Sequence, residues 1–459
     1  MDLFIPADDP SVYMPIHPID FRYGTQEMRR IWSEEARFNA IIRSEAALAA
    51  AEAEVGLIPS DAAEAIAAGA SKVTLRRANE IEAEINHDMM AVVKALAEVS
   101  GPAGRWVHYG ATSNDILDTA TALQVKDALD CIEEKLKILL GILIERSTAT
   151  RMLVCAGRTH GQIGVPTTYG LRFAIWASEI GRHILRLRDI RPRVVVGQLT
   201  GAVGTQAAFG DDGMEVQAAM MRHLGIGSVD VSNQVIARDR YAEYFFMLAN
   251  IATTLDKIGI EIRSLQRTEI AEVEEAFGKK QVGSSTMPHK RNPIKSEQVG
   301  GLARVIRSAV EPALLNNTLW DERDLTNSSC ERVIFPEATI LCDHCLKVMA
   351  QALDGLIIKE ENVKKNLDLQ HGINLAESVM IELTRRGMDR QAAHEIIRET
   401  SMKALMETRP LADILSEIPE VTALISPAEI EDALQPERYI GTAVQQVERV
   451  IKKLAPLTS

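Results

Sequence analysis

The stretch GSSTMPHKRNP, from Gly283 to Pro293, gathers hydroxyl, amide and cationic side chains in a segment without helical periodicity. Gly283 permits backbone conformations that other residues avoid and can serve as a hinge, whereas Pro288 and Pro293 block helix continuation. Such a set can hold a carboxylate and stabilise charge that develops on it, although a solvated connection between helices is the alternative. The side chains that offer this chemistry are Ser284, Ser285, Lys290, Arg291 and Asn292.

A second candidate is His160 in GRTHGQ, which lies between glycines and outside any apolar helix pattern. Imidazole is the side chain that most often acts as a general acid or base near neutral pH. A histidine can equally be a structural residue whose ring nitrogens are satisfied by the protein. From the residues alone, a general acid and a structural histidine are even alternatives.

Three more stretches combine polar side chains at short spacing. The His–Asp pair of EINHDMM fits a helix surface as well as a site. HYGATSND suits a helix N-cap, and the same amides and hydroxyls can bind a carboxylate. WDERDLTNSSCER can clamp a phosphate or form a charged helix face. The candidate residues here are Asn86, His87, Asp88, Thr112, Ser113, Arg323, Ser328 and Arg332.

Two other motifs are weaker. GKKQVGSS (278–285) nearly matches the phosphate-cradling pattern G-x-x-x-x-G-K-[ST], but Ser284 replaces the lysine, and the preceding IAEVEEAF predicts a helix where a strand is required. CDHC (342–345) lacks a second ligand pair at zinc spacing and lies within a helical pattern. We therefore expect neither a P-loop nor a metal site.

Composition restricts the class of protein. The 459 residues are 46% hydrophobic, 25% charged and only 4% aromatic, which favours a globular, helical chain. A net charge of −13 argues against a nucleic-acid partner. Five cysteines, an odd and sparse set, favour reduced thiols. The start MDLFIPADDP lacks signal-peptide features and no apolar stretch is long enough to span a bilayer, so we expect a cytoplasmic protein without a membrane partner.

Helical periodicity dominates the elements that must position these residues. Apolar residues recur at spacings of three and four in segments 132–143, 173–187 and 251–265, which predicts long helices packed side by side. RVVVG near Val195 is the main candidate for a strand. Breaks in pattern predict an N-terminal helical domain (1–112), a central long-helix bundle (113–364) and a C-terminal helical domain (365–459). Because YFFMLANIATTL is apolar on more than one side, we predict an all-α oligomer.

Together these stretches resemble the fumarase/aspartase superfamily, whose loop signature GSSTMPHKRNP matches. Within it the chain resembles the adenylosuccinate lyase family, because RYG near Arg22, NHD, HYGATSND, GRTHGQ, SNQVIARDR and WDERDLTNSSCER follow that family's order from Ile16 onward. The resemblance implies an all-helical homotetramer, active sites shared between three subunits, and no cofactor. It implies elimination of fumarate from adenylosuccinate, giving AMP, and from succinyl-aminoimidazole-carboxamide ribotide in purine synthesis.

The resemblance also implies residue roles. Ser284 is the general base that takes a proton from the succinyl carbon next to a carboxylate, and His160 is the general acid for the departing nitrogen. A serine is a poor base unless its alkoxide is stabilised, which Lys290 and the amides at a helix start can do. Groups on the succinyl side are Lys290, Asn292, Thr112 and Ser113. Nucleotide-side contacts are Arg22, Tyr23, Arg323, Ser328 and Arg332, and further pocket positions are Asn86, His87, Asp88, Gln234, Ser285 and Arg291.

Some positions depart from the family pattern. Asp321 stands where histidine is frequent, Ala237 stands where glutamine is frequent, and residues 1–15 form an extension without an assigned role. The alternatives are another lyase of the superfamily or a carboxymuconate cycloisomerase, which would share the Ser284 loop but lack the phosphate clamp. A helical oligomer without catalysis is a further alternative, and intact Ser284, His160 and Lys290 argue against it.

Overall fold

The computed structural model describes residues 16–278 and 280–458. The opening MDLFIPADDP, the rest of the 1–15 extension and the first lysine of GKKQVGSS lie outside the described residues. Contacts divide the chain into two compact units. Unit 1 takes residues up to 135 together with 183–255 and 301–347, and unit 2 takes 136–182, 256–300 and residues from 348 onward. The division into three domains stays a prediction.

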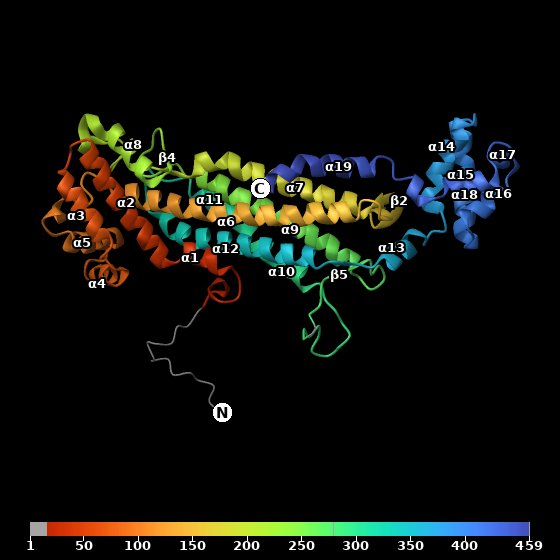
Figure 1. Cartoon of the computed structure of the whole chain (residues 1–459), viewed down its shortest axis with the longest axis horizontal. Coiled ribbons are helices and arrows are strands. Elements are labelled where there is room, and N and C mark those ends of the chain that lie inside the picture. The colour runs from red at the N-terminus through yellow and green to blue at the C-terminus, as the bar shows by residue number, and fades with distance from the viewer. Residues whose placement is uncertain (1–15, 279, 459) are drawn as a thin grey trace, which may run out of the picture. The chain divides into compact units, whose positions relative to one another are not determined.

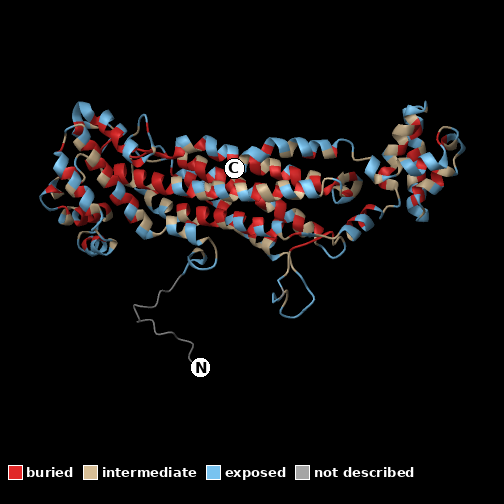
Figure 2. Ribbon diagram, in the orientation of Figure 1, coloured by how far each residue is buried: buried red, intermediate tan, exposed pale blue. Residues whose placement is uncertain are grey.

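Helices make up most of the structure (Figure 1). The apolar residues that predicted the long helices are buried, as Figure 2 shows along those ribbons: Ile132, Leu136, Leu139 and Leu143 are each 0% exposed. The all-α class is therefore confirmed. Helices with residues in both units are α6 (Ser113–Ala149), α7 (Tyr169–Val194), α9 (Asp239–Leu265), α10 (Ile294–Ser308) and α12 (Thr326–Asp354).

In unit 1, side-chain contacts join parts of four long helices in a ring, from α6 to α7, α9, α12 and back to α6. These contacts are Glu133–Arg188, His183–Thr254, Tyr244–Thr339 and Lys135–Asp343, at 2.8, 2.9, 2.8 and 2.5 Å. An apolar core joins the shorter helices α2, α3, α5 and α8. The shorter helices of unit 1 are α1 (Gln26–Ile31), α2 (Glu34–Glu54), α3 (Ser60–Ala70), α4 (Leu75–Ile85), α5 (Asp88–Val99), α8 (Gly213–Leu224) and α11 (Val310–Leu315), with 3-10 turns at Pro18–Asp20, Gly101–Trp106 and Ala207–Asp212.

Capping side chains set where several of these helices begin. Thr25, Ser33 and Thr74 each accept a backbone N–H from the first turn of α1, α2 and α4, at 3.2 Å in all three cases. The first amides of a helix have no partner within it, so such acceptors stabilise the helix start. The local sequence therefore fixes these boundaries before tertiary packing is considered.

In unit 2, α14, α15, α16 and α18 share a separate apolar core around Val379, Leu383 and Leu411. The C-terminal helix packs on α7, where a Cβ on Gly181 would lie 2.5 Å from a methyl of Leu454. The missing Cβ of glycine therefore lets Leu454 lie close to α7. The helices of this unit are α13 (Glu360–Leu367), α14 (Ala376–Arg385), α15 (Arg390–Glu407), α16 (Leu411–Ser416), α17 (Pro419–Thr422), α18 (Pro427–Ala433) and α19 (Ala443–Leu454), with 3-10 turns at Ile373–Leu375, Pro436–Arg438 and Ala455–Leu457.

Within the described ranges, strands form only two-stranded sheets. β1 (Val154–Thr159) pairs with β2 (Gln162–Thr168) antiparallel, β3 (Val196–Gly197) with β4 (Gly227–Ser228) parallel, and β5 (Val273–Glu274) with β6 (Ile357–Ile358) antiparallel. The strand predicted at RVVVG is confirmed as β3. A strand, β5, also precedes GKKQVGSS, but α10 begins only at Ile294, so this is not the tight strand-to-helix turn of a P-loop.

The helix predicted for IAEVEEAF is wrong, because this stretch is extended around β5. Glu272, Glu274 and Glu275 are 0%, 8% and 4% exposed, and their carboxylates bind partners from different elements. An extended backbone directs neighbouring side chains to opposite sides, which a helix does not. Specific ion pairs therefore override the helical propensity of glutamate here.

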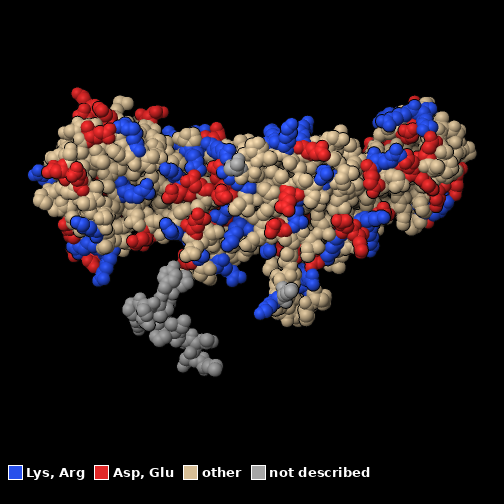
Figure 3. All heavy atoms as spheres, viewed as in Figure 1, with Lys and Arg blue, Asp and Glu red and all other residues tan. Residues whose placement is uncertain are grey.

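Charge is dispersed over the face of the molecule in Figure 3, where Lys and Arg are interspersed with Asp and Glu. A search of the described residues finds no helix of sufficient length and apolarity to cross a membrane. Cys342 and Cys345 of CDHC lie in α12 with buried thiols, as the helical pattern predicted. Burial raises the pKa of the Cys342 thiol well above its usual value, so this sulfur stays protonated.

We expect Glu52→Gln to stabilise the folded chain above neutral pH. Glu52 lies in α2, is 0% exposed, and neither of its carboxyl oxygens has a hydrogen-bond partner among the described residues. Burial, reinforced by the charge of Glu45, raises the pKa of Glu52 from 4.5 to about 9. Because the folded-state pKa exceeds the unfolded one, the stability tied to this proton is complete below pH 4.5 and is lost as the pH rises to about 9.

At pH 7 that loss is about 3 kcal/mol, which the neutral glutamine avoids. The melting temperature of Glu52→Gln should exceed that of the wild type at about pH 8, and the difference should shrink towards pH 5. Glu35→Gln, an exposed position in the same helix, serves as the control. A melting-temperature difference that does not change with pH would contradict a buried neutral carboxyl.

Candidate active site

Unit 1 contains a cavity of about 310 Å³ that is lined by predicted nucleotide-side residues. Arg323 precedes α12, and Ser328 and Arg332 lie in the first turns of that helix. The rings of Trp32 and Phe335 stack at 5.6 Å and form an apolar wall. The lining also includes polar residues that no predicted role covered: Arg37, Asn114, Asp118, Thr121, Arg238, Asn327 and Glu331.

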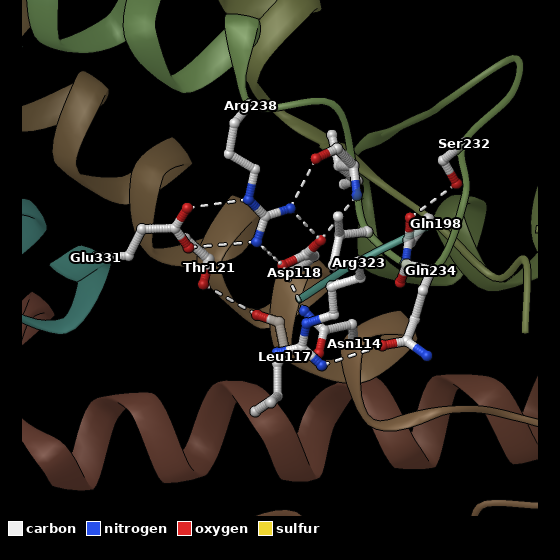
Figure 4. Close-up of polar contacts among 12 residues, drawn as sticks. Asn114, Leu117, Asp118, Thr121, Gln198, Ser232, Gln234, Arg238, Arg323 and Glu331 are labelled. Carbon is white, nitrogen blue, oxygen red and sulfur yellow. Dashed lines mark hydrogen bonds and ion pairs between the residues drawn. The ribbon is translucent and has the colours of Figure 1, made fainter. Parts of the chain in front are cut away.

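Arg238 forms a buried ionic centre beside this cavity (Figure 4). It is 2% exposed and donates to the two carboxylate oxygens of Asp118 at 2.7 and 2.8 Å and to those of Glu331 at 2.9 and 3.2 Å. Burial alone would lower the pKa of Arg238, but the two carboxylates outweigh it and hold that pKa well above its usual value. Protein acceptors therefore satisfy this guanidinium, which ties α6 to α12.

Arg323 and Arg37 are in the opposite electrostatic situation. Burial lowers the pKa of Arg323, and it lowers that of Arg37, where the charge of Arg332 adds to the effect. Arg323 Nη1 donates to Oε1 of Gln234 at 3.1 Å, as Figure 4 shows, while its Nε has no partner among the described residues. An anion in the cavity would stabilise both charged guanidinium groups.

The NHD residues connect α4 and α5 to this cavity. Asn86 ends α4 in a left-handed conformation with a φ of 52°, and Nδ1 of His87 accepts a backbone N–H of α5 at 3.2 Å. Asp88 forms a short ion pair with Arg332. Burial raises the pKa of Asp88, but a backbone N–H and Arg332 outweigh burial and hold that pKa below its usual range. Asn86 and His87 thus act as caps, and Asp88 positions a cavity arginine.

Thr112 and Ser113 lie at the start of α6. A side chain before the helix was expected to accept an N–H of its first turn. Instead, Asp115 inside the helix accepts the N–H of Thr112, which precedes the helix, at 2.9 Å. Asp115 is 0% exposed and also accepts the backbone N–H groups of Thr200 at 2.8 Å and Gly201 at 3.1 Å. The Thr112 and Ser113 hydroxyls form no hydrogen bond with the described residues, which leaves both for a ligand.

The Arg22–Tyr23 stretch packs against α12. The rings of Tyr23 and His344 lie 5.4 Å apart between centroids, and the guanidinium of Arg22 lies 5.9 Å from the Tyr23 ring centre. Gly24, with a φ of 100°, approaches Ile340 so closely that a Cβ would lie 2.4 Å from its side chain. Helix α12 therefore carries Ser328 and Arg332 near its start and contacts the Arg22–Tyr23 stretch nearer its C-terminal end.

His160 lies at the tip of the β1–β2 hairpin in unit 2. Thr159 pairs with Gln162, so His160 and Gly161 form a two-residue turn with φ values of 53° and 75°. Two positive φ values are typical of a type I′ turn, which prefers Asn and Gly. A histidine in this region is strained, and such strain concentrates at functional sites. The imidazole is exposed and forms no hydrogen bond with the part of the chain that the structure describes.

The loop from Gly283 to Pro293 contains no helix or strand, as predicted, and Figure 2 shows it largely exposed. Oγ of Ser284 accepts the backbone N–H groups of Thr286 at 3.3 Å and Met287 at 3.1 Å. Donors directed at an oxygen favour its anionic form, so these amides make the Ser284 hydroxyl easier to deprotonate. These amides lie within the loop and not at a helix start, where stabilising amides were expected from the sequence.

The φ of Gly283 is not positive, so backbone conformation does not explain why this position is a glycine. Close packing does explain it. A Cβ there would lie 1.9 Å from the carbonyl oxygen of Lys290, and Nδ2 of Asn292 donates to the Gly283 carbonyl at 3.0 Å. These contacts hold the two ends of the loop, Gly283 and Lys290–Asn292, against each other. Nη1 of Arg291 forms an ion pair with Oε1 of Glu274 at 2.5 Å. The ammonium group of Lys290, in contrast, has no ion pair with any described residue.

The predicted residues fall into two groups. His160 and the Ser284 loop belong to unit 2, and the others belong to unit 1. Within unit 1 the structure joins Arg323 to Gln234 and Arg332 to Asp88. The motifs missed the ionic centre and Arg37. Arg238 lies inside the motif SNQVIARDR, so the motif could have identified it as a candidate. Arg37 lies in α2, where nothing in the local sequence marks it as a site residue.

Comparison with known proteins assigns this fold and site to a class. A lyase family model matches residues 20–308, and a model described as adenylosuccinate lyase C-terminus matches residues 372–450. Among solved structures, a fumarate lyase from Mesorhizobium sp. BNC1 is 30% identical, with a TM-score of 0.87 over 95% of this chain and 100% of that chain. The 3-carboxy-cis,cis-muconate lactonizing enzyme from Pseudomonas putida is 33% identical, with a TM-score of 0.86 over 95% and 98%. The fold and site therefore define a lyase of the fumarase/aspartase superfamily.

Relatives of higher identity narrow this class. The adenylosuccinate lyase of Pyrococcus horikoshii is 53% identical over 441 residues, which are 96% of this chain and 98% of the relative. That of Methanocaldococcus jannaschii is 53% identical over 445 residues, 96% of each chain. The chain belongs to the adenylosuccinate lyase family, a family of carbon–nitrogen lyases. The family resemblance drawn from the motifs is thus confirmed.

Proposed function

We propose that the chain eliminates fumarate from adenylosuccinate, giving AMP, and from succinyl-aminoimidazole-carboxamide ribotide. The observation that carries this proposal is the unit 1 cavity, where Arg37, Arg323 and Arg332 line the same space as Ser328. Guanidinium groups bind phosphate through paired N–H donors, and an anion would stabilise the partly buried charges of Arg37 and Arg323. A substrate without a phosphate, as in the cycloisomerase alternative, would leave the charges of Arg37 and Arg323 without that anion.

In the proposed elimination, Ser284 takes the proton from the succinyl carbon next to a carboxylate. The electron pair of that C–H bond forms the new double bond as the carbon–nitrogen bond breaks, and His160 gives a proton to the departing nitrogen. Charge accumulates on the carboxylate, so each preorganised donor aimed at it is worth about 3 kcal/mol. Donors proposed for the succinyl group are Lys290, Asn292, Thr112 and Ser113.

The remaining assignments complete a site that we propose is shared between three subunits of a homotetramer. Ribose and phosphate contacts are assigned to Arg22 and Tyr23, ordering of the substrate near His160 to Gln234, and further pocket positions to Asn86, His87, Asp88 and Ser285. A cytoplasmic location stays a prediction from composition.

Arg323→Ala should raise the KM for adenylosuccinate by about 10- to 100-fold, because a charge-assisted bond to phosphate is lost. It should also remove most of the preference for adenylosuccinate over the corresponding nucleoside, which lacks the phosphate. Fumarate release by the purified protein measures both effects, and Arg105→Ala, an exposed arginine of unit 1, is the control. Unchanged kinetics of Arg323→Ala on the nucleotide would instead favour a superfamily relative with a phosphate-free substrate.

A further inference from the structure

Glu272, Glu274 and Glu275 form a cluster of carboxylates around β5 in unit 2, and this cluster is defined here as the carboxylate anchor. Their exposures are 0%, 8% and 4%, although glutamate is rarely buried without a partner. Burying an ionised carboxylate is unfavourable unless hydrogen bonds and cations compensate. The partners of each carboxylate therefore indicate what this segment holds in place.

Glu272 binds both ends of the hairpin that carries His160. Its Oε1 accepts from Nη2 of Arg158 at 2.5 Å, and its Oε2 accepts the hydroxyl of Tyr169 at 2.7 Å. Arg158 lies in β1 two residues before His160, and Tyr169 follows β2 directly. Nδ2 of Asn366 in α13 donates to the same carboxylate at 3.0 Å. One buried carboxylate thus fixes the hairpin at its base and near its tip.

Glu274 binds the loop that carries Ser284. Its Oε1 accepts from Nη1 of Arg291 at 2.5 Å, and its Oε2 pairs with Nζ of Lys359 at 2.5 Å. Partial burial raises the pKa of Glu274, but Lys359 and Arg291 outweigh burial and hold that pKa below its usual range. The Arg291 guanidinium also lies 5.4 Å from the ring centre of Phe277, which precedes the loop in the chain.

Glu275 binds the residues that immediately follow the loop. Its Oε2 accepts the backbone N–H of Lys295 at 3.0 Å, and its Oε1 accepts the backbone N–H and hydroxyl of Ser296 at 2.8 and 2.5 Å. These amides belong to the first turn of α10, where a helix lacks internal acceptors. The returning end of the loop is therefore fixed on both sides of Pro293.

We propose that the carboxylate anchor positions both catalytic segments of unit 2, and that the Glu274–Arg291 pair is the contact that places the Ser284 loop. This inference rests on the proposed roles of Ser284 and His160. It assigns Arg291 to positioning, not to substrate binding, because its guanidinium is already bound within the protein. The three residues are positioning residues, since they act on the substrate only through the segments they hold.

The Glu274–Arg291 pair allows a sharper test than the other contacts, because Glu272 is wholly buried and Glu275 caps a helix. Glu274→Gln keeps the shape of the side chain and removes its charge. It should lower kcat for adenylosuccinate by about 10- to 100-fold, the effect of a displacement of about 1 Å in a catalytic group, with KM changed much less. Deuterium uptake of peptides from residues 280–293 should rise in the same variant.

Lys359→Met is the matched control, because it removes the other partner of the same carboxylate and leaves Arg291 in place. Its kcat and its deuterium uptake in residues 280–293 should stay near those of the wild type. Arg291→Met should reproduce the effect of Glu274→Gln, and the double variant should be no worse than either single variant, as expected for residues that act through each other. Arg291→Lys, which keeps the charge, should recover part of kcat.

Two results would overturn the proposal. One is a fall in kcat for Glu274→Gln without increased exchange in residues 280–293, and the other is additive effects of Glu274→Gln and Arg291→Met. The exchange measurement needs no substrate. If the wild type releases no fumarate from adenylosuccinate, the proposed function fails while increased exchange in Glu274→Gln still supports the anchor.

Discussion

Ser284→Ala should lower kcat for fumarate release from adenylosuccinate by about 10⁴-fold, at the upper end of what one general base contributes. The reason is local: Oγ of Ser284 receives two backbone N–H groups that favour its anionic form, and an alanine leaves no oxygen there. KM should change only a few-fold, because this oxygen is proposed to act on a C–H bond and not on a charged group of the substrate. Steady-state kinetics with the purified protein provide the measurement.

Thr286→Ala is the control for Ser284→Ala. Its side chain is exposed, and its backbone N–H still donates to Ser284, so kcat should remain within a few-fold of wild type. If Ser284→Ala retained a tenth or more of the wild-type kcat, another group would have to be the base. The loop would then be a substrate-binding element alone.

His160→Asn should lower kcat by about 10²- to 10⁴-fold, because the departing nitrogen loses its proton donor. Asparagine is the substitution of choice, since it tolerates the φ of 53° at this position and preserves the two-residue turn. The loss can therefore be attributed to the imidazole and not to a distorted hairpin. His394→Ala, an exposed histidine of α15, should leave kcat unchanged. Retention of most activity in His160→Asn would remove His160 from the mechanism.

Mixed oligomers extend this test to the shared site. If Ser284 and His160 of one site come from different subunits, random exchange between Ser284→Ala and His160→Asn proteins restores roughly one quarter of wild-type activity, because that share of sites has both groups intact. If both groups come from one chain, mixing restores nothing. Recovery therefore decides between a shared and a self-contained site.

Sequence patterns predicted the parts of the fold that depend on local spacing. The stripe from Ile132 to Leu143 buries one face of α6, and a period of 3.6 residues is enough to detect it. The β1–β2 hairpin was missed because its burial does not alternate and its turn is His–Gly, not Asn–Gly. IAEVEEAF was misread because glutamate favours helices, and only distant cations reveal why it is extended.

The candidate site shows the same limit. Loop, hairpin and clamp were found because each combines unusual side chains within a few residues. The ionic centre was not found, because Arg238 binds Asp118 and Glu331, which lie 120 and 93 residues away in the sequence. No local pattern marks such a partnership. The unpartnered carboxyl of Glu52 was invisible for a related reason, because its burial depends on helices that pack later in the chain.

The turn at His160 has a consequence for how this position would change under selection. A histidine with a positive φ makes the hairpin less stable than Asn or Gly would. Variants selected only for a folded protein should therefore replace His160 readily, while variants selected for growth that depends on the activity should keep it. Where activity needs a strained conformation, stability and function are in a trade-off. At the hairpin tip the two pressures oppose each other, and a histidine persists there only as long as its chemistry is needed.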